Sequence, residues 1–221
     1  MKNIKIATVG LCMLTLSGCA TKQGTGALIG TGAGAVLGGI IGKIAGNTAV
    51  GAAIGGAVGA GTGAIIGHHM DKVAAEAAQV SSAKVEEVTD ANGLKAVKVS
   101  FDSGILFQLN QAVLNSSSKT DLAKFSKVLI NNADCHVDIY GYTDRSGNDA
   151  INVPLSQKRA DSVADYLKSC GVSASQLQNV VGKGSQDEIE NKKISQLNRR
   201  VEVYLYASPE MVEKANAGTL N

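Results

Sequence analysis

Tryptophan is absent from this 221-residue chain, and five Tyr and three Phe are few aromatics for its length. Excess charge is lacking as well, because 21 basic residues face 19 acidic ones and the formal net charge is +2. The basic residues form no stripe interleaved with aromatics, and the sequence carries no RNA-binding signature. These absences argue against nucleic acid or another polyanion as the partner.

Catalytic patterns are lacking too. His136 has no Ser or Cys nucleophile placed to use it. His68 and His69 are adjacent, so they point in different directions on a helix and make a poor metal site. The glycine-rich part of the chain lacks the Lys-Ser/Thr ending of a phosphate-binding loop. We therefore expect a protein that is not an enzyme and that carries neither a metal nor a cofactor.

The chain opens like an exported protein. Lys2 and Lys5 precede the apolar run 6–16, which is typical of a signal peptide over residues 1–18. The following Leu16-Ser17-Gly18-Cys19 resembles the lipobox of bacterial lipoproteins. That resemblance implies cleavage before Cys19 and acyl chains on Cys19, which heads a short lipidated N-terminus at 19–23. By the same analogy, Ala20 favours the outer membrane. The alternative is an ordinary signal peptide that happens to contain a cysteine.

Glycines recur at every fourth position between residues 24 and 67. The positions are 26, 30, 34, 38, 42 and 46, and then 51, 55, 59, 63 and 67. Such a run makes a poor helix in water, but in lipid a ridge of glycines lets two helices approach closely. We expect a glycine-zipper helical hairpin over residues 24–67 that turns at Asn47-Thr48, and the alternative is a flexible Gly/Ala linker. The pattern leaves open whether the hairpin spans the membrane, lies on its surface or forms oligomers.

A connector and a second unit follow. Residues 68–93 read as a helical linker, helical over Met70–Val88 and closed by a turn at residues 90–93. From Leu94 the pattern changes to alternation, which is typical of half-buried strands. We expect a globular domain at 94–207 and a flexible tail at 208–221.

Within this domain, strands alternate with helices. We predict strands at 97–101, 135–142, 177–182 and 199–207, helices at 117–130 and 156–169, and one helical turn at 194–198. Ser156 is the expected N-cap of the second helix, directly after Leu155 and Pro154. The fold class is therefore α+β, in the order β-α-β-α-β-(α)-β, with the helices packed on one face of a small mixed sheet.

Several motifs of this domain keep a characteristic mutual spacing. They are Gly141-Tyr142-Thr143-Asp144, Gly147, Asn152, Leu155-Ser156, Arg159-Ala160, Val163 and Asn198-Arg199-Arg200-Val201. This set resembles the signature of OmpA-like peptidoglycan-binding domains and covers about residues 95–207. With the lipobox and the glycines, the chain looks like an OmpA-like outer-membrane lipoprotein with a zipper. It departs from many family members in the loop 185–193, which is short and has no proline.

The resemblance implies that the ligand is the diaminopimelate of the peptidoglycan stem peptide. Asp144 would accept from its ammonium, and Arg159, expected in the first turn of its helix, would bind its carboxylate. Asn152 maps onto a ligand-contacting position, and Thr143, Leu155 and Asp102 are weaker candidates for the pocket wall. The alternative is a structural salt bridge between Asp144 and Arg159.

Two cysteines remain after the signal peptide and Cys19. Cys135 begins a predicted strand and Cys170 ends the helix that follows it, so the two lie at the same end of a strand-loop-helix unit. The periplasm is oxidising, so we predict a disulfide between them, and the alternative is two thiols. Arg199 and Arg200 are adjacent and face opposite sides of their strand; a ligand role for Arg200 is the less favoured reading.

Together these features predict a lipid-anchored tether of the outer membrane, with its C-terminal domain in the periplasm. It would bind peptidoglycan noncovalently. One alternative is a zipper-driven membrane oligomer or pore component that wall binding only positions. Another is a hydrolase acting on the wall, although the domain offers no catalytic carboxylate set beyond Asp144.

Overall fold

The computed structural model describes residues 60–90, 93–102, 106–107 and 110–220. The predicted signal peptide, the lipidated Cys19 and the zipper up to residue 59 lie outside these residues. Within them, no helix is both long and apolar enough to cross a bilayer. The described helices are α3 (Ala60–Ala77), α5 (Ser116–Asn131), α6 (Asp149–Ser169) and α7 (Pro209–Asn216).

Five strands form one mixed sheet. They are β1 (Ala83–Thr89), β2 (Lys95–Asp102), β3 (Cys135–Gly141), β4 (Leu177–Gly182) and β5 (Arg200–Ala207). Their spatial order is β1-β2-β5-β3-β4, and β3 pairs parallel with β4 while the other three pairings are antiparallel. The last strand in the chain is therefore central, and α6 is the crossover that parallel pairing requires.

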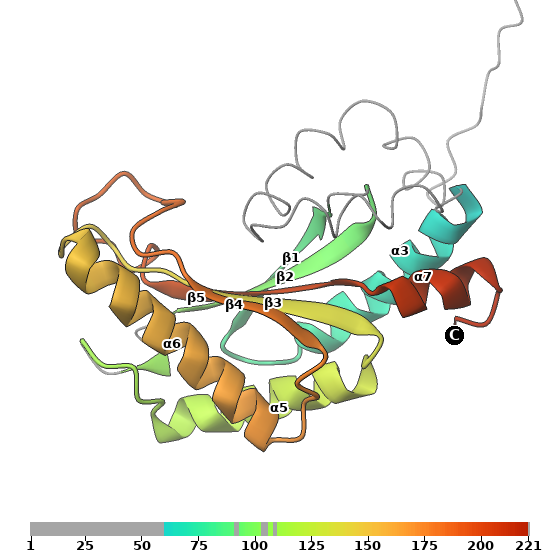
Figure 1. Ribbon diagram of the computed structural model, residues 1–221, viewed down its shortest axis with the longest axis horizontal. Helices are drawn as coiled ribbons and strands as arrows, with labels where there is room; N and C mark the ends of the chain where they lie inside the picture. The colour runs from blue at the N-terminus through green and yellow to red at the C-terminus, as the bar shows by residue number, and fades with distance from the viewer. Residues whose placement is uncertain (1–59, 91–92, 103–105, 108–109, 221) are drawn as a thin grey trace, which may run out of the picture.

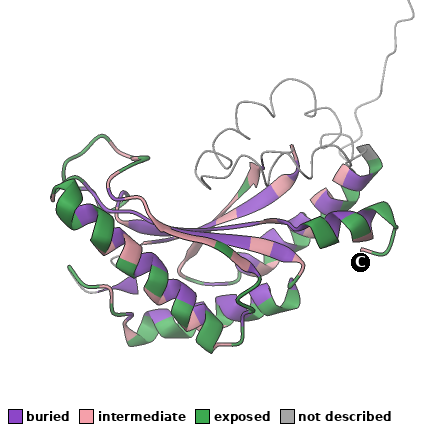
Figure 2. Cartoon of the chain, viewed as in Figure 1, coloured by how far each residue is buried: buried purple, intermediate pink, exposed green. Residues whose placement is uncertain are grey.

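One face of the sheet carries the main core (Figure 1). Val201, Val203 and Leu205 alternate along β5 and join the apolar faces of α3, α5 and α6 in this core. The opposite face holds a smaller tyrosine cluster of Tyr140, Tyr142 and Tyr204. In Figure 2 the inner strands β5 and β3 are largely buried and the edge strands β1 and β4 are partly exposed, whereas α6 is exposed along its outer side. The predicted α+β class, the mixed sheet and the alternation along the last strand are all confirmed.

The helical linker is correct only in its first part. Helix α3 ends at Ala77, and residues 83–89, which were predicted to be helical, form β1 and pair with β2. Ala, Glu and Lys in this segment favour a helix locally, but pairing with β2 overrides that preference. The turn predicted at 90–93 includes residues 91–92, which lie outside the described residues, but its ends are joined: Gly93 N–H donates to the Asp90 carbonyl at 3.1 Å.

The C-terminal segment is also ordered, so the prediction of a flexible tail was wrong. Ser208 caps α7 by accepting from the N–H of Met211, and Met211, Val212 and Ala215 are buried. At the far end of the helix, Thr62 of α3 donates to the side chain of Asn216 at 2.6 Å. The sequence signal for this helix was the Ser-Pro start, since Ser favours the N-cap and Pro the first helical position.

Two predictions inside the domain also need correction. Helix α6 begins seven residues before Ser156, with Asn148 as its N-cap and Pro154 inside it. Arg159 is therefore in the middle of the helix, so the N-terminal dipole does not act on it as predicted. The expected helical turn at 194–198 is a hydrogen-bonded turn over residues 196–198, and no α-helix is present between β4 and β5, a stretch the structure describes in full.

Candidate functional site

Two glycines place α6 against the ends of β3 and β4. Gly141 and Gly182 are paired across these strands. A Cβ on Gly141 would lie 2.2 Å from the carbonyl oxygen of Ser156, and one on Gly182 would lie 2.2 Å from the backbone nitrogen of Gln157. Any side chain at either position would push the helix away. The close approach fixes the part of α6 that carries Arg159, next to the loop that carries Asp144.

Asp144 lies just beyond β3 and is only 2% exposed. Its Oδ1 accepts from the backbone N–H and the hydroxyl of Ser146. Its Oδ2 accepts from the N–H of Ser195 at 3.3 Å and from Arg199 Nη1 at 2.6 Å. Burial by itself would raise the pKa of Asp144, but hydrogen bonds from Ser146, Arg199 and Ser195 outweigh it and hold the pKa below its usual range. The carboxylate is therefore ionised and accepts four hydrogen bonds.

Arg159 is 4% exposed, and its guanidinium is incompletely bonded. Its Nε donates to the carbonyl of Gln111 at 3.1 Å, and the guanidinium lies over the ring of Phe107. Its Nη1 is buried and has no hydrogen-bond partner. Burial and the nearby charge of Arg199 lower the pKa of Arg159, and Asp144 opposes that shift. The structural salt bridge that we weighed for Asp144 joins it to Arg199, rather than to Arg159.

The four remaining predicted residues each have different surroundings. Asn152 is buried and its amide donates to the backbone carbonyl of Asp144 at 3.0 Å, so it fixes the loop. Thr143 is buried with its hydroxyl unpaired, which leaves a second polar atom at the site without a partner. Leu155 lines a neighbouring cavity of about 460 Å³, together with Gln111, whose carbonyl accepts from Arg159. Asp102 accepts from Gln196, the neighbour of Ser195.

The segment between β4 and β5 completes the site. Asn198 is fully buried, and its side-chain oxygen accepts from the N–H groups of Ile189 and Glu190. These bonds shape the loop that brings Ser195 and Arg199 to Asp144. The sequence reasoning missed Ser195 and assigned no site role to Arg199. Their signal was the Asn198-Arg199-Arg200 run, but a partner more than 50 residues away cannot be read from spacing.

Arg200 has a different role. Its side chain is 6% exposed and forms an ion pair with Glu202 at 2.7 Å, and it also donates to the carbonyl of Asp187. It lies over the ring of Tyr142 at 3.8 Å. The contacts of Arg200 therefore lie on the tyrosine side of the sheet. A ligand role for Arg200 was the less favoured reading of the sequence.

The predicted disulfide is not formed. Cys135 and Cys170 are free thiols. Cys135 faces α3, where its sulfur lies 3.9 Å from Met70 Sδ, whereas Cys170 caps α6 beside Tyr166. The start of β3 and the end of α6 share one end of the domain, but their side chains turn to different neighbours.

The arrangement suits a ligand that carries a carboxylate. Two guanidiniums, Arg159 and Arg199, surround one carboxylate, Asp144, so the local charge is positive. Arg199 already binds Asp144, and the unpaired donor belongs to Arg159. A buried guanidinium with an unused N–H is stabilised by an incoming carboxylate, which it binds in a planar geometry that a lysine cannot reproduce.

Comparisons with known proteins agree with the fold and the motifs. Residues 106–202 match the OmpA family, and residues 1–71 match the YMGG-like Gly-zipper. The probable lipoprotein YiaD of Escherichia coli is 34% identical over 219 residues, which cover 90% of this chain and 95% of YiaD.

Other similar proteins match a smaller part of this chain. Outer membrane protein P5 of Haemophilus influenzae is 33% identical over 121 residues, or 54% of this chain, and this chain spans only about a third (34%) of the length of P5. The crystal structure of a putative MotB-like protein from Desulfovibrio vulgaris superposes with a TM-score of 0.55 at 20% identity, covering 65% of this chain and 94% of that one. That likeness supports the fold.

Proposed function

The chain belongs to the OmpA family, and from that premise we propose that it is an outer-membrane lipoprotein that holds the outer membrane to the cell wall. Its C-terminal domain binds peptidoglycan noncovalently and performs no catalysis. The ligand is the diaminopimelate of the stem peptide, and the acylated Cys19 is the membrane anchor. One observation carries the proposal: the buried Arg159 guanidinium keeps an unpaired Nη1 beside the Asp144 carboxylate.

The chemistry of diaminopimelate fits this pair of residues. Its free end carries an ammonium and a carboxylate on one carbon. The carboxylate binds Arg159, whose Nη1 has no other partner. Each charge-assisted hydrogen bond contributes about 1.5–3 kcal/mol, which corresponds to roughly a tenfold to hundredfold change in affinity. A lysine-type stem peptide lacks this carboxylate and binds more weakly, because it leaves Arg159 as unpaired as it is in the free protein.

The ammonium requires a rearrangement at Asp144. A carboxylate offers about four acceptor positions, and Asp144 already accepts from Ser146, Ser195 and Arg199. Arg199 is the charged partner among these three, and 28% of its side chain is accessible. The ligand ammonium therefore takes the place of the Arg199 guanidinium on Oδ2, which exchanges one cation for another.

Cosedimentation with purified diaminopimelate-type peptidoglycan tests this proposal. The full chain is used in detergent, beside Arg159→Lys and Asp144→Asn. We expect the wild type to pellet and both variants to stay largely in solution, since Lys cannot donate two parallel hydrogen bonds and Asn cannot balance the ammonium charge. A lysine-type peptidoglycan should retain much less of the wild-type protein.

Arg145→Gln is the matched control. Arg145 lies next to Asp144 in the same loop, but it is exposed and forms its ion pair with Glu188. The Arg145→Gln variant should pellet like the wild type. Circular dichroism establishes that every variant is folded. A wild-type protein that stays in solution, or an Arg159→Lys variant that pellets fully, would overturn the proposed ligand contact.

A second role is favoured by the match of residues 1–71 to the YMGG-like Gly-zipper. In this alternative the zipper assembles several chains in the membrane and wall binding positions the assembly. Gly34→Leu or Gly59→Leu would block close helix approach. Detergent-resistant oligomers that these substitutions abolish would support the assembly, and a wild-type chain that is strictly monomeric in detergent would exclude it.

A further inference from the structure

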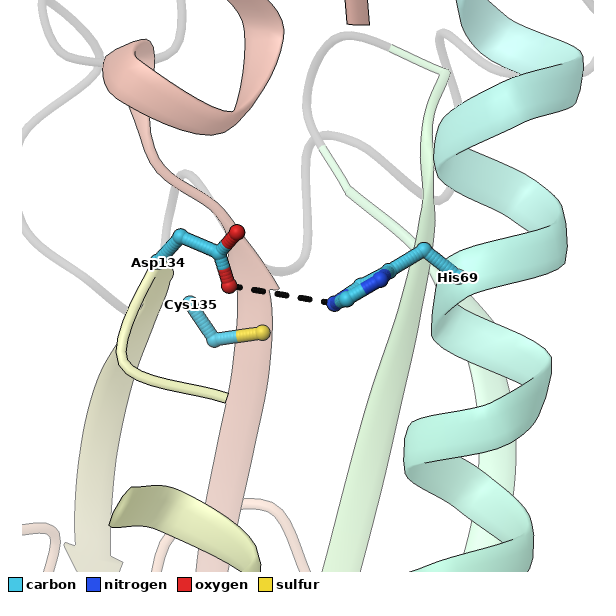
Figure 3. Close-up of side chains that lie close together, drawn as sticks. All are labelled: His69, Asp134 and Cys135. Carbon is cyan, nitrogen blue, oxygen red and sulfur yellow. Dashed lines mark ion pairs between the residues drawn. The ribbon is translucent and has the colours of Figure 1, made fainter. Parts of the chain in front are cut away.

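A cluster of potential metal ligands lies far from the Asp144 site. It joins α3 to the start of β3, segments about 65 residues apart in the sequence (Figure 3). His69 of α3, Asp134 and Cys135 each offer one ligand atom, and these three atoms lie within 4.8 Å of one another. Figure 3 shows the imidazole, the carboxylate and the sulfur converging on the space between the helix and the strand.

We propose that His69, Asp134 and Cys135 bind a Zn²⁺ ion. Imidazole nitrogen, carboxylate oxygen and cysteine sulfur are the three donor types that zinc takes in proteins. Metal–ligand distances of about 2.0–2.3 Å place neighbouring tetrahedral ligands roughly 3.3–3.8 Å apart. His69 Nε2 and Asp134 Oδ1 are already 3.8 Å apart. The largest separation in the cluster therefore needs to shorten by no more than about 1.5 Å to enclose the ion.

The charges around the cluster also suit a divalent cation. A thiolate and a carboxylate together neutralise Zn²⁺, while the imidazole binds as a neutral ligand. The second oxygen of Asp134 lies 4.0 Å from Lys214 Nζ, which leaves Oδ1 facing His69. Such a partner outside the ligand set orients a metal-binding carboxylate.

Burial keeps the site closed. Cys135 is fully buried, and the side chains of His69 and Asp134 are 13% and 17% exposed. Met70 Sδ lies 3.9 Å from the Cys135 sulfur and shields it. Cys135 is a free thiol. Zinc binding replaces that S–H proton with a sulfur–metal bond and releases the proton to solvent.

A metal here would act as a clamp. Helix α3 includes the last zipper glycines, Gly63 and Gly67, and β3 leads into the Asp144 loop. Zinc would fix the helix that continues from the zipper onto the domain that carries the site. It would stabilise the folded chain, because the unfolded chain does not hold these ligands together.

Isothermal titration of the reduced, EDTA-treated full chain with ZnCl₂ tests the site. We expect one Zn²⁺ per chain and a rise in the melting temperature. His69→Ala and Cys135→Ser should each weaken binding at least tenfold. The matched controls are His68→Ala, which removes the adjacent exposed histidine, and Cys170→Ser, which removes the other thiol; both should bind like the wild type.

Cobalt gives a readout that does not depend on stability. In the Cys170→Ser variant, Co²⁺ should produce a thiolate-to-cobalt charge-transfer band that zinc abolishes and that requires Cys135. The assignment is overturned if the wild type takes up no stoichiometric zinc or if His68→Ala weakens binding as much as His69→Ala. It is also overturned if no charge-transfer band appears, or if the site takes Cu⁺ through Met70 and ignores Zn²⁺.

Discussion

Asp144 and Arg159 are both buried, but their surroundings differ. Asp144 accepts four hydrogen bonds, whereas the Nη1 of Arg159 donates none. Asp144 is held in place by its hydrogen bonds, whereas Arg159 keeps one N–H donor for a ligand. Substitution of Asp144 should therefore reduce both stability and binding, whereas substitution of Arg159 should reduce mainly binding.

The stability contribution of Asp144 should depend on pH. Because the folded state lowers its pKa, the ionised carboxylate stabilises the fold above the unfolded-state pKa, and this contribution is lost as the pH falls through the folded pKa. We expect Asp144→Asn to cost about 1–3 kcal/mol at neutral pH and clearly less near pH 3. Urea unfolding of the wild type and the variant at both pH values measures the difference.

Asp138 provides the opposite case. Burial raises its pKa despite hydrogen bonds from Asn179, Tyr140 and Tyr206. A raised carboxyl pKa means that the folded wild type gains stability relative to Asp138→Asn as the pH falls.

The Asp144 prediction has a clear contrary outcome. If Asp144→Asn lowered the free energy of unfolding equally at both pH values, the ionised form of Asp144 would not be the source of the stabilisation.

At the scale of elements, the position of α6 depends on two glycines, Gly141 and Gly182. Gly141→Ala and Gly182→Ala would each place a methyl group 2.2 Å from the backbone of α6. We expect each to lower the free energy of unfolding by about 1–3 kcal/mol or more, because backbone cannot move aside as a flexible side chain does. Thermal and urea denaturation measure the loss.

Gly67→Ala is the control for these two substitutions. Gly67 lies in α3, and an added Cβ there meets no atom within 4 Å. Alanine is favoured over glycine in a helix by about 1 kcal/mol, so this variant should be slightly more stable than the wild type. Equal losses at all three glycines would contradict the close approach of α6.

Helix α7 should contribute to stability although it lies in the segment predicted to be a flexible tail. Met211 is fully buried against the core that α3 also joins. Met211→Ala should cost about 2–5 kcal/mol, whereas Glu213→Ala, at an exposed position of the same helix, should cost little. Chemical denaturation distinguishes an ordered helix from a loose tail, for which both substitutions would be neutral.

At the scale of the molecule, the described fold is larger than the domain recognised by its motifs. Helix α3 contributes Ile66, Met70 and Val73 to the core, and every residue of β1 pairs with β2. A fragment of residues 60–221 should unfold cooperatively. A fragment of 90–221, which loses α3 and β1, should unfold at a much lower denaturant concentration. Its free energy of unfolding should also change less steeply with denaturant concentration, because less surface is exposed on unfolding. Equal transitions for the two fragments would show that α3 and β1 add nothing.

The sequence by itself determined the strands and helices with regular apolar spacing. Val201, Val203 and Leu205 identified β5 and its two faces, and the glycines and charged residues of the 141–160 segment identified the site loop. These features depend on local periodicity and on a shared motif, so one sequence was enough to predict them.

Only the tertiary structure decided the partners. It turned residues 83–89 from helix to strand, ordered the C-terminal helix and carried α6 through Pro154. In the folded chain Asp144 forms its ion pair with Arg199, and Arg159 keeps an N–H donor without a partner. Cys135 lies beside Met70 and His69. These outcomes depend either on contacts between groups that are 48 to 65 residues apart in the sequence or on packing that outweighs local preference. Neither is encoded in the spacing of neighbouring residues.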